Sequence, residues 1–289
     1  MKFSVIVVNF NGAKLTLACV ASIRAHIPSI PYEIIVVDNQ SSDREGEALK
    51  RQLPECAIVL SEKNVGFGGA NNLGASRASG ELLLFLNNDT LVSSDIFTPL
   101  AAALEQNRHL GLIGPALRNQ DGTFQVSFGR FPSLGNEWRT RRLGRRFNHK
   151  NLDQVGTIET REREWITGAA MMARKECFER LGGFDESYFM YFEDVDLCYR
   201  ARLLGYEIGY AAGCSITHLG GMSYASGEPH IQVEYRRSQL RFYDKFRAWP
   251  ERLMLRAYLL VKACVGFITA SDRRTSAAFA GLVFKSHGK

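Results

Sequence analysis

The first half of the chain alternates short, unbroken apolar runs with stretches of amphipathic spacing. Such runs between turn residues are typical of strands that are covered on both faces. We predict strands in FSVIVVN, EIIVVD, AIVLS and LLLFL, at residues 3–9, 33–38, 57–61 and 82–86. Between these strands the sequence predicts an amphipathic helix over about 13–26, a charged helix after the Ser/Asp turn that follows the second strand, and a helix of small residues near 69–78. Because strands that recur with helices between them form βαβ units, the sequence predicts an α/β fold with a mainly parallel sheet.

The second half of the chain is less regular. Residues 112–128 predict strands with a turn at 119–122, and Glu193 opens a helix whose apolar positions fall on one face. An extended segment, SITHLGG, follows at 215–221. Two basic amphipathic helices, separated near Pro250, close the chain.

Composition and charge narrow the class of partner. Hydrophobic residues make up 45% of the chain and charged residues 23%, a balance that allows a sizeable globular core. The net charge of +6 favours an anionic partner, which leaves nucleotide phosphates, lipid headgroups and nucleic acid open. The arginine-rich run WRTRRLGRRFNHK (138–150) lacks the interleaved aromatic residues of a nucleic-acid stacking platform. We therefore predict no nucleic-acid partner.

The chain carries features of a cytoplasmic protein. Its six cysteines form no CxxC pair, which is typical of reduced thiols, and the N-terminus enters a strand pattern with no signal peptide. The most apolar late stretch, 257–270, is interrupted by Lys262 and is shorter than the roughly 20 residues that a membrane-spanning helix needs.

Polar groups follow three of the predicted strands. They are NFN at 9–11, DNQSSD at 38–43 and NND at 87–89. Ligands of parallel sheets bind beyond the carboxyl ends of the strands, so all three groups are expected at one crevice. Asn and Asp are also favourable turn and cap residues, which is the alternative for each group. In the functional interpretation NND supplies oxygen ligands to a cation, and Asp38 accepts hydrogen bonds from a nucleobase or ribose.

A glycine-rich segment, KNVGFGGANNLG, lies at the third strand–helix turn (63–74). Its G-x-G-G pattern differs from the G-x-G-x-x-G of dinucleotide-binding folds, which belongs at the first such turn. We interpret these glycines as positions where the backbone approaches a ligand closely, and not as an NAD site.

A few side chains of the second half could carry chemistry. Glu193 and Asp194 begin a helix, where charge–dipole placement is ordinary, but Asp194 lies on the buried side and is a candidate general base. His218 could be a metal ligand or a structural histidine bonded to a carbonyl. Trp165 precedes the small residues 167–170, so its indole could stack on a sugar ring or pack in the core.

Six motifs occur in an order that resembles a known enzyme family. They are SVIVVNFNG, IIVVDNQSSD, NVGFGGANNLG, LLFLNNDT, ITGAAMMARKECFERLGGFDESYFMYFEDVDLCYRARLLGY and ITHLGG. Together they resemble the inverting family 2 glycosyltransferases with the GT-A fold, in the branch of bacterial rhamnosyltransferases. The resemblance implies one GT-A domain over 1–230, with a nucleotide-binding half (1–115) and an acceptor-binding, catalytic half (116–230). Residues 231–289 would form a C-terminal helical appendage able to associate with a membrane.

The resemblance also implies the residues of the site. Asp89 matches the last position of the family's DxD metal motif, Asn87 the first, and His218 a further ligand of some relatives. These residues would bind Mg²⁺ or Mn²⁺. Asp194 matches the general base. The other expected contacts are Asn9, Asn11, Asp38 and Asn64 around the nucleotide, and Trp165, Gly168 and Glu193 around the donor sugar and acceptor.

The implied reaction moves a sugar from a nucleoside-diphosphate donor, with dTDP-L-rhamnose favoured, to a hydroxyl of a glycan or polyprenyl-diphosphate-linked acceptor. It would serve bacterial cell-surface polysaccharide synthesis, such as that of O-antigen in lipopolysaccharide. Two alternatives are a non-catalytic module of the same fold that binds nucleotide sugar or glycan, and a sugar nucleotidylyltransferase. The second alternative needs a Gly-rich loop with Lys or Arg after the first strand, which NFNGAKL matches poorly.

Two basic segments need their own interpretation. The run at 138–150 would either close over the phosphates of the acceptor or form a solvated loop. The last helices place Leu253, Ala257, Leu260, Cys264 and Phe267 along one stripe, near Arg252, Arg256, Arg273 and Arg274. Such a stripe predicts either a helix on anionic lipid, at the inner face of the plasma membrane, or a helix that faces a partner chain or the core.

Overall fold

The computed structural model describes residues 2–27, 30–136, 158–159, 163–220, 229–268 and 273–284. The basic run at 138–150 lies outside these residues, as do the side chains of Arg273 and Arg274. As far as it is described, the chain forms two compact units. The first takes Met1–Phe131, Asn148–Ser187 and Glu193–Gly221, and the second takes Pro132–Phe147, Tyr188–Phe192 and Met222–Lys289. The domain boundary at residue 230 stays a prediction.

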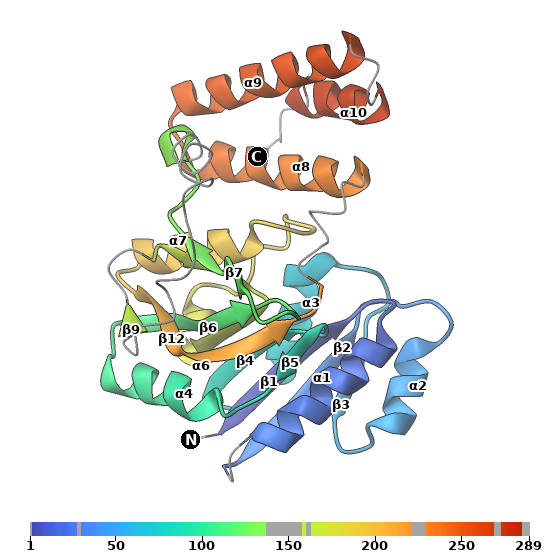
Figure 1. The fold of residues 1–289 in the computed structure, drawn as a ribbon, viewed down its shortest axis with the longest axis vertical. Coiled ribbons are helices and arrows are strands. Elements are labelled where there is room, and N and C mark those ends of the chain that lie inside the picture. Colours follow the sequence, from blue (N-terminus) through green and yellow to red (C-terminus); the bar gives the residue numbers. More distant parts are fainter. Residues whose placement is uncertain are drawn as a thin grey trace. The chain divides into compact units, whose positions relative to one another are not determined.

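One mixed sheet forms the centre of the first unit (Figure 1). Its strands are β1 (Phe3–Asn9), β2 (Tyr32–Asp38), β3 (Ala57–Leu60), β4 (Leu82–Asn87), β5 (Thr90–Val92), β6 (Leu110–Arg118), β7 (Phe124–Gln125), β9 (Ile158–Glu159), β11 (Ala170–Arg174) and β12 (Glu207–His218). They lie in the order β3-β2-β1-β4-β11-β6-β12-β5, while β7 pairs with β6 and β9 with β12. A separate two-stranded sheet joins β8 (Phe128–Gly129) to β10 (Trp165–Ile166). The helices of this unit are α1 (Ala13–His26), α2 (Glu45–Gln52), α3 (Gly66–Arg77), α4 (Phe97–Gln106), α6 (Lys175–Arg180) and α7 (Glu193–Leu203).

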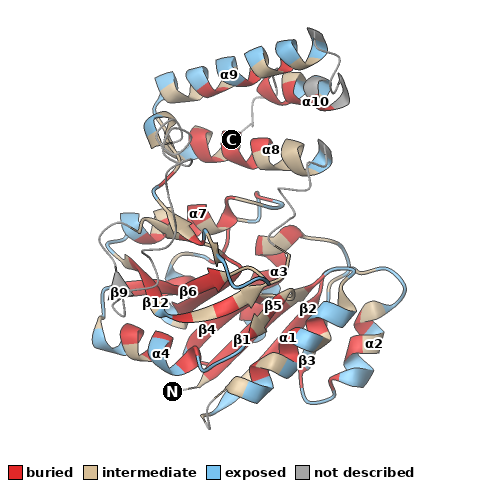
Figure 2. Ribbon diagram, viewed as in Figure 1, coloured by how far each residue is buried: buried red, intermediate tan, exposed pale blue. Residues whose placement is uncertain are grey.

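The four strands predicted in the first half are present as β1 to β4, and they pair in parallel. Figure 2 shows β1, β2 and β4 as almost entirely buried. Helices cover both faces of these strands, which is why the strands carry apolar residues without a polar alternation. The register places Asn9 of β1 beside Asp38 of β2, so the polar groups that follow the strands meet at one edge.

Helix α3 shows why its sequence is so rich in small residues. A Cβ atom added to Gly74 would lie 2.5 Å from Ile6 Cγ2 and 3.1 Å from Val37 Cγ2. Any side chain at this position would push the helix away from β1 and β2. The other face of the same strands packs against α1 and α4, where Cys19, Val20 and Phe97 belong to the buried core.

The second half of the sheet is not parallel throughout. Strand β11 pairs antiparallel with β4 and β6, and β12 runs parallel to β6 but antiparallel to β5. These pairings bring distant parts of the sequence to the end of β4, because Ala170 lies beside Leu86 and His218 beside Thr90. The predicted α/β class is confirmed.

Helices α8 (Pro229–Phe246), α9 (Trp249–Ile268) and α10 (Arg273–Phe284) form the described part of the second unit that follows residue 228. The sequence predicted two helices separated near Pro250, and α8 and α9 fulfil that expectation. The pattern did not predict α10, where small residues and Gly281 weaken the helical signal, but Phe279 and Leu282 are buried. Among the described residues, no helix has the length and apolar character to cross a bilayer.

Candidate active site

Asp89 lies between β4 and β5, at the carboxyl edge of the sheet. The pairing of β12 with β5 brings His218 to the same place, with its Nε2 atom 3.1 Å from Asp89 Oδ1 and 3.4 Å from Asn87 Nδ2. A Cβ atom at Gly220 would lie 1.7 Å from Asp89 Oδ2, so this close approach requires glycine. The three residues predicted as metal ligands therefore lie together.

The oxygen atoms of this cluster are suited to a cation. Asn87 Oδ1 and Asp89 Oδ1 are buried and accept no hydrogen bond from the described residues, and Asp89 Oδ1 has its polar contact with His218 Nε2 at 3.1 Å. Buried oxygens without partners are costly, and carboxylate, amide and imidazole groups are ligands that Mg²⁺ and Mn²⁺ accept. The described residues contain no group of three or more His, Cys, Asp and Glu that could hold a metal. An ion bound here would therefore need further ligands from water or from a substrate phosphate.

Gln125 of β7 orients the imidazole of His218. The Nδ1 atom of His218 is 2.9 Å from Gln125 Oε1. Because an amide oxygen only accepts hydrogen bonds, this contact assigns a proton to Nδ1, while Nε2 is the ring nitrogen that faces Asp89 and Asn87. The sequence analysis missed Gln125, since no local pattern reports a contact between segments so far apart in the chain.

Asp194 lies in the first turn of α7. Its Oδ2 atom accepts a hydrogen bond of 2.9 Å from the backbone N–H of Gly168, and its Oδ1 atom accepts one of 2.7 Å from Val195. Burial raises the pKa of Asp194 above the ordinary aspartate value, although these hydrogen bonds and one from the Thr167 side chain oppose the rise. The residue as a whole is half-buried, and the raised pKa makes its carboxylate a stronger base than a free aspartate.

Glu193 is only 5% exposed, and its Oε2 atom has no hydrogen-bond partner among the described residues. Burial in the first place, and then the negative charge of Asp194, raise the pKa of Glu193 well above the ordinary glutamate value. Two adjacent carboxyl groups in such surroundings do not both ionise. We therefore assign the proton to Glu193, as a hydrogen-bond donor, and the negative charge to Asp194.

The turn formed by residues 167–169 connects the surroundings of Asp194 to the end of β4. The backbone N–H of Asn87 donates to the carbonyl of Ala169 at 3.0 Å, while Gly168 donates to Asp194. A Cβ atom at Gly168 would lie 3.0 Å from the ring of Phe67. Asp89 and Asp194, far apart in the sequence, therefore lie at the same edge of the sheet.

Trp165 of β10 is half-buried, and its indole N–H donates a hydrogen bond of 3.0 Å to the carbonyl of Arg130. This bond fixes the direction of the ring. Contact of Trp165 or Gly168 with a sugar stays a prediction.

Asn9 is fully buried at the end of β1, and its side chain is used within the protein. Its Nδ2 atom donates to Asp38 Oδ1 at 2.8 Å and to Ser41 Oγ at 2.9 Å, and its Oδ1 accepts a hydrogen bond from Thr16. These contacts hold Asp38 in place at the crevice. The structure thus gives Asn9 the geometry of a residue that positions Asp38, and its direct contact with a nucleotide stays a prediction.

Two further predicted nucleotide contacts lie on turns that are tied to the turn after β2. Asn64 Oδ1 accepts a hydrogen bond of 2.9 Å from Asn39 Nδ2 and one of 3.0 Å from the backbone N–H of Gly66. Asn11 is exposed, has a positive φ of 51°, and its Oδ1 atom accepts a hydrogen bond of 2.7 Å from the backbone N–H of Ser42. Asn39 was missed by the sequence analysis, although it stands inside the motif DNQSSD.

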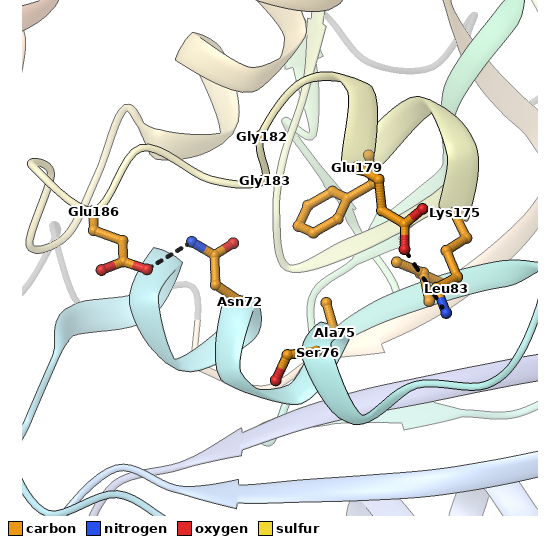
Figure 3. A pocket seen from close by; sticks show the side chains of 10 residues that line it. Asn72, Ala75, Ser76, Leu83, Lys175, Glu179, Gly182, Gly183 and Glu186 are labelled. Atoms are coloured by element: carbon orange, nitrogen blue, oxygen red, sulfur yellow. Dashed lines mark hydrogen bonds and ion pairs between the residues drawn. The ribbon is translucent and has the colours of Figure 1, made fainter.

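A different part of the first unit contains a hollow of about 330 Å³, between α3 and α6 (Figure 3). An Asn72–Glu186 hydrogen bond of 3.0 Å flanks one side of it, and the Lys175–Glu179 ion pair of 3.8 Å flanks the other. None of the predicted site residues lines this hollow. The unpaired oxygens of Asn87 and Asp89 and the raised pKa values of Glu193 and Asp194 lie elsewhere, so we place the chemistry at those residues.

Comparisons with known proteins identify the family and the fold. The sequence model of glycosyl transferase family 2 matches residues 4–168, more than half of the chain. The N-acetylglucosaminyl-diphospho-decaprenol L-rhamnosyltransferase of Mycobacterium tuberculosis is 24% identical over 272 residues, which cover 85% of this chain and 86% of that protein. Rhamnosyltransferase WbbL of Escherichia coli K12 is 28% identical over 65% of this chain and 72% of its own length.

The fold also matches solved structures. GalNAc-T7 in complex with UDP, GalNAc and Mn²⁺ superposes with a TM-score of 0.60 and 19% identity, over 82% of this chain and 47% of that one. The likeness confirms the predicted GT-A fold. The family match leaves the sugar nucleotidylyltransferase alternative without support. By its motifs, its fold and its match over residues 4–168, this chain belongs to glycosyl transferase family 2.

Proposed function

We propose that this protein is an inverting rhamnosyltransferase that moves L-rhamnose from dTDP-L-rhamnose to a hydroxyl of a glycan or polyprenyl-diphosphate-linked acceptor. Relatives named rhamnosyltransferase, at 24% and 28% identity, support the sugar. The name of the first of them includes a diphospho-decaprenol group, which supports the acceptor class. The six cysteines, all free thiols, agree with a reducing compartment such as the cytoplasm.

One observation carries the catalytic part of the proposal. Asp194 has a carboxylate with a raised pKa, held by the N–H of Gly168 at the sheet edge where Asp89 and His218 also lie. A general base and an anion-stabilising site at one edge are what a single displacement at a sugar carbon requires.

In the proposed reaction, Asp194 removes the proton from the acceptor hydroxyl while that oxygen attacks the anomeric carbon. The bond from this carbon to the diphosphate oxygen breaks, its electron pair stays on the phosphate, and the configuration at carbon inverts. Protonated Glu193 would donate a hydrogen bond to the donor sugar or acceptor. Trp165 and Gly168 would contact the same groups.

Asn87, Asp89 and His218 would hold the divalent cation, either Mg²⁺ or Mn²⁺. A cation there offsets the negative charge that develops on the departing diphosphate. Asp38 would accept a hydrogen bond from the nucleoside, with Asn9 holding it in position, and Asn11 and Asn64 would line the same nucleotide crevice.

The test is Asp194→Asn, with Asp121→Asn in an exposed turn as the control. We expect Asp194→Asn to lower the rate of rhamnosyl transfer on the order of 10²- to 10⁴-fold while the affinity for dTDP is retained. The control should keep wild-type rates. Near-normal transfer by Asp194→Asn would remove Asp194 as the base. Binding of donor by the wild type without any transfer would instead favour the non-catalytic module.

A further inference from the structure

Helix α9 has an exposed side along most of its length (Figure 2), and the residues on that side are mostly apolar. Leu253 is 57% exposed, Met254 60% and Val261 62%. We call the following set the α9 outer face: Leu253, Met254, Ala257, Tyr258, Val261, Cys264, Val265 and Phe267, all of them exposed. At 100° per residue these positions cover about half of the helix circumference, without a charged side chain.

The opposite side of α9 faces the interior of its own unit. Leu255, Leu259 and Ala263 are buried there. Four of the five residues of the stripe predicted from the sequence lie on the outer face, and the fifth, Leu260, is half-buried. The core-facing alternative for this stripe is therefore wrong, because the core is made by the other side of the helix.

The net positive charge of residues 229–284 favours an anionic surface as the partner of the α9 outer face. Between Pro229 and Phe284 the sequence has ten Lys and Arg against four Asp and Glu, an excess equal to the net +6 of the whole chain. No acidic residue follows Glu251 within α9. A second copy of the chain would bring two such positive units together, whereas an anionic bilayer complements them.

We propose that the α9 outer face binds anionic lipid, with α9 lying in the plane of the membrane surface. Basic residues beside an apolar face, on a helix that does not span a bilayer, are the features of an interfacial helix. Arg252, Arg256 and Lys262 are half-buried beside the face and add to its positive charge, although Arg256 also forms an ion pair of 2.7 Å with Asp244 of α8. Trp249, 72% exposed at the start of α9, suits the headgroup region. This inference does not depend on the donor, the acceptor or the base.

Co-sedimentation of the full-length protein with lipid vesicles tests it. The vesicles contain either phosphatidylglycerol mixed with phosphatidylcholine or phosphatidylcholine alone. We expect the wild type to pellet with the first kind and to be released as salt screens the basic residues. Leu253→Gln with Val261→Gln should weaken this binding about tenfold or more, since both changes remove apolar groups from the interface.

Leu203→Gln is the matched control, because Leu203 is an apolar residue with 67% exposure on α7, in the other unit. It should pellet like the wild type. Equal pelleting of the double variant and the wild type would overturn the proposal, as would equal binding to uncharged vesicles. A wild-type dimer in light scattering that the double variant converts to a monomer, with vesicle binding unchanged, would assign the face to a second copy instead.

Discussion

At the scale of single residues, the chemical role of each side chain in the site depends on which of its atoms carry protons. His218 donates through Nδ1 to Gln125, and its Nε2 atom lies 3.1 Å from Asp89 Oδ1 and 3.4 Å from Asn87 Nδ2. Burial and the charge of Asp194 raise the pKa of Glu193 well above the ordinary glutamate value, so we assign the proton of this pair to Glu193. These assignments suit the proposed roles of the three side chains: His218 as a metal ligand, Glu193 as a hydrogen-bond donor and Asp194 as a base.

Gln125→Met removes the acceptor that fixes His218. We expect the neutral imidazole to lose its preference for the Nδ1-protonated form, and Mn²⁺ to bind about 10- to 100-fold more weakly, the usual effect of losing such an outer partner. Nitrogen NMR of labelled histidine, with His218→Asn to assign the signal, measures the first effect, and Mn²⁺ titration by electron paramagnetic resonance measures the second. Gln125→Glu keeps an acceptor oxygen and should keep the wild-type tautomer. An unchanged histidine spectrum in Gln125→Met would contradict the assignment.

Glu193→Gln tests the proton on Glu193 through stability. The pKa of Glu193 is raised in the folded protein, so its contribution to stability is complete below the ordinary glutamate range and is lost as pH rises through the raised value. Glutamine cannot ionise and avoids this loss. We expect Glu193→Gln to increase the free energy of unfolding in urea by about 1 kcal/mol at mildly alkaline pH, and the gain to vanish in acid.

Glu105→Gln, at an exposed position of α4, is the control and should differ little from the wild type at either pH. A difference between Glu193→Gln and the wild type that is the same in acid and in base would show that ionisation is not its cause.

The sequence could predict Asp89 and Asp194 because each belongs to a motif of neighbouring residues. It could not predict Gln125 or the role of Gly220, since each acts on a residue that only the sheet brings near it. The signal for Gly220 was present in the motif ITHLGG, but its reason, a backbone that passes over Asp89, is visible only in three dimensions.

At the scale of elements, the first four strands were predictable because their apolar runs are short and covered on both faces. The antiparallel strands β5 and β11 were not, since a local pattern does not state the direction of pairing. Helix α7 illustrates the same limit. Its sequence predicts a helix, but not that Arg200 joins it to the loop after α6 through hydrogen bonds to the carbonyls of Leu181 and Gly183.

Arg200 also forms an ion pair of 2.5 Å with Asp196, a fully buried carboxylate of α7. Arg200→Met removes this charge from beside Asp196, and we expect the free energy of unfolding in urea to fall by about 3–5 kcal/mol. Adding Asp196→Asn should recover a large part of the loss, because the buried charge is then gone. Arg180→Met, at an exposed arginine of α6, should change stability by less than about 0.5 kcal/mol. If the double variant is no more stable than Arg200→Met, the buried charge is not the source of the loss.

At the scale of the whole molecule, the two units differ in what they can bind. The predicted metal and nucleotide residues all lie in the first unit, whereas the second carries the basic helices with the α9 outer face. The predicted metal ligands come from the end of β4, the turn after it and β12, and the predicted nucleotide residues from the ends of β1 and β2 and the turns after β1 and β3. Only the folded unit brings these strand ends together. A ligand that contacts all of them therefore binds the folded state alone and stabilises it.

We therefore expect dTDP with Mn²⁺ to slow hydrogen–deuterium exchange at residues 9–11, 38–41, 64–66 and 87–89 of the full-length protein. The same ligands, at about 100 times their dissociation constant, should add roughly 2.7 kcal/mol to the stability of the folded state. Helices α8, α9 and α10 should exchange as they do without ligand, because none of the predicted contacts lies in them. His218→Ala should reduce the part of the protection that depends on Mn²⁺ and keep the part that dTDP gives alone. Protection confined to α6 and to the lining of the hollow in Figure 3 would move the donor site there and contradict the placement at Asp89.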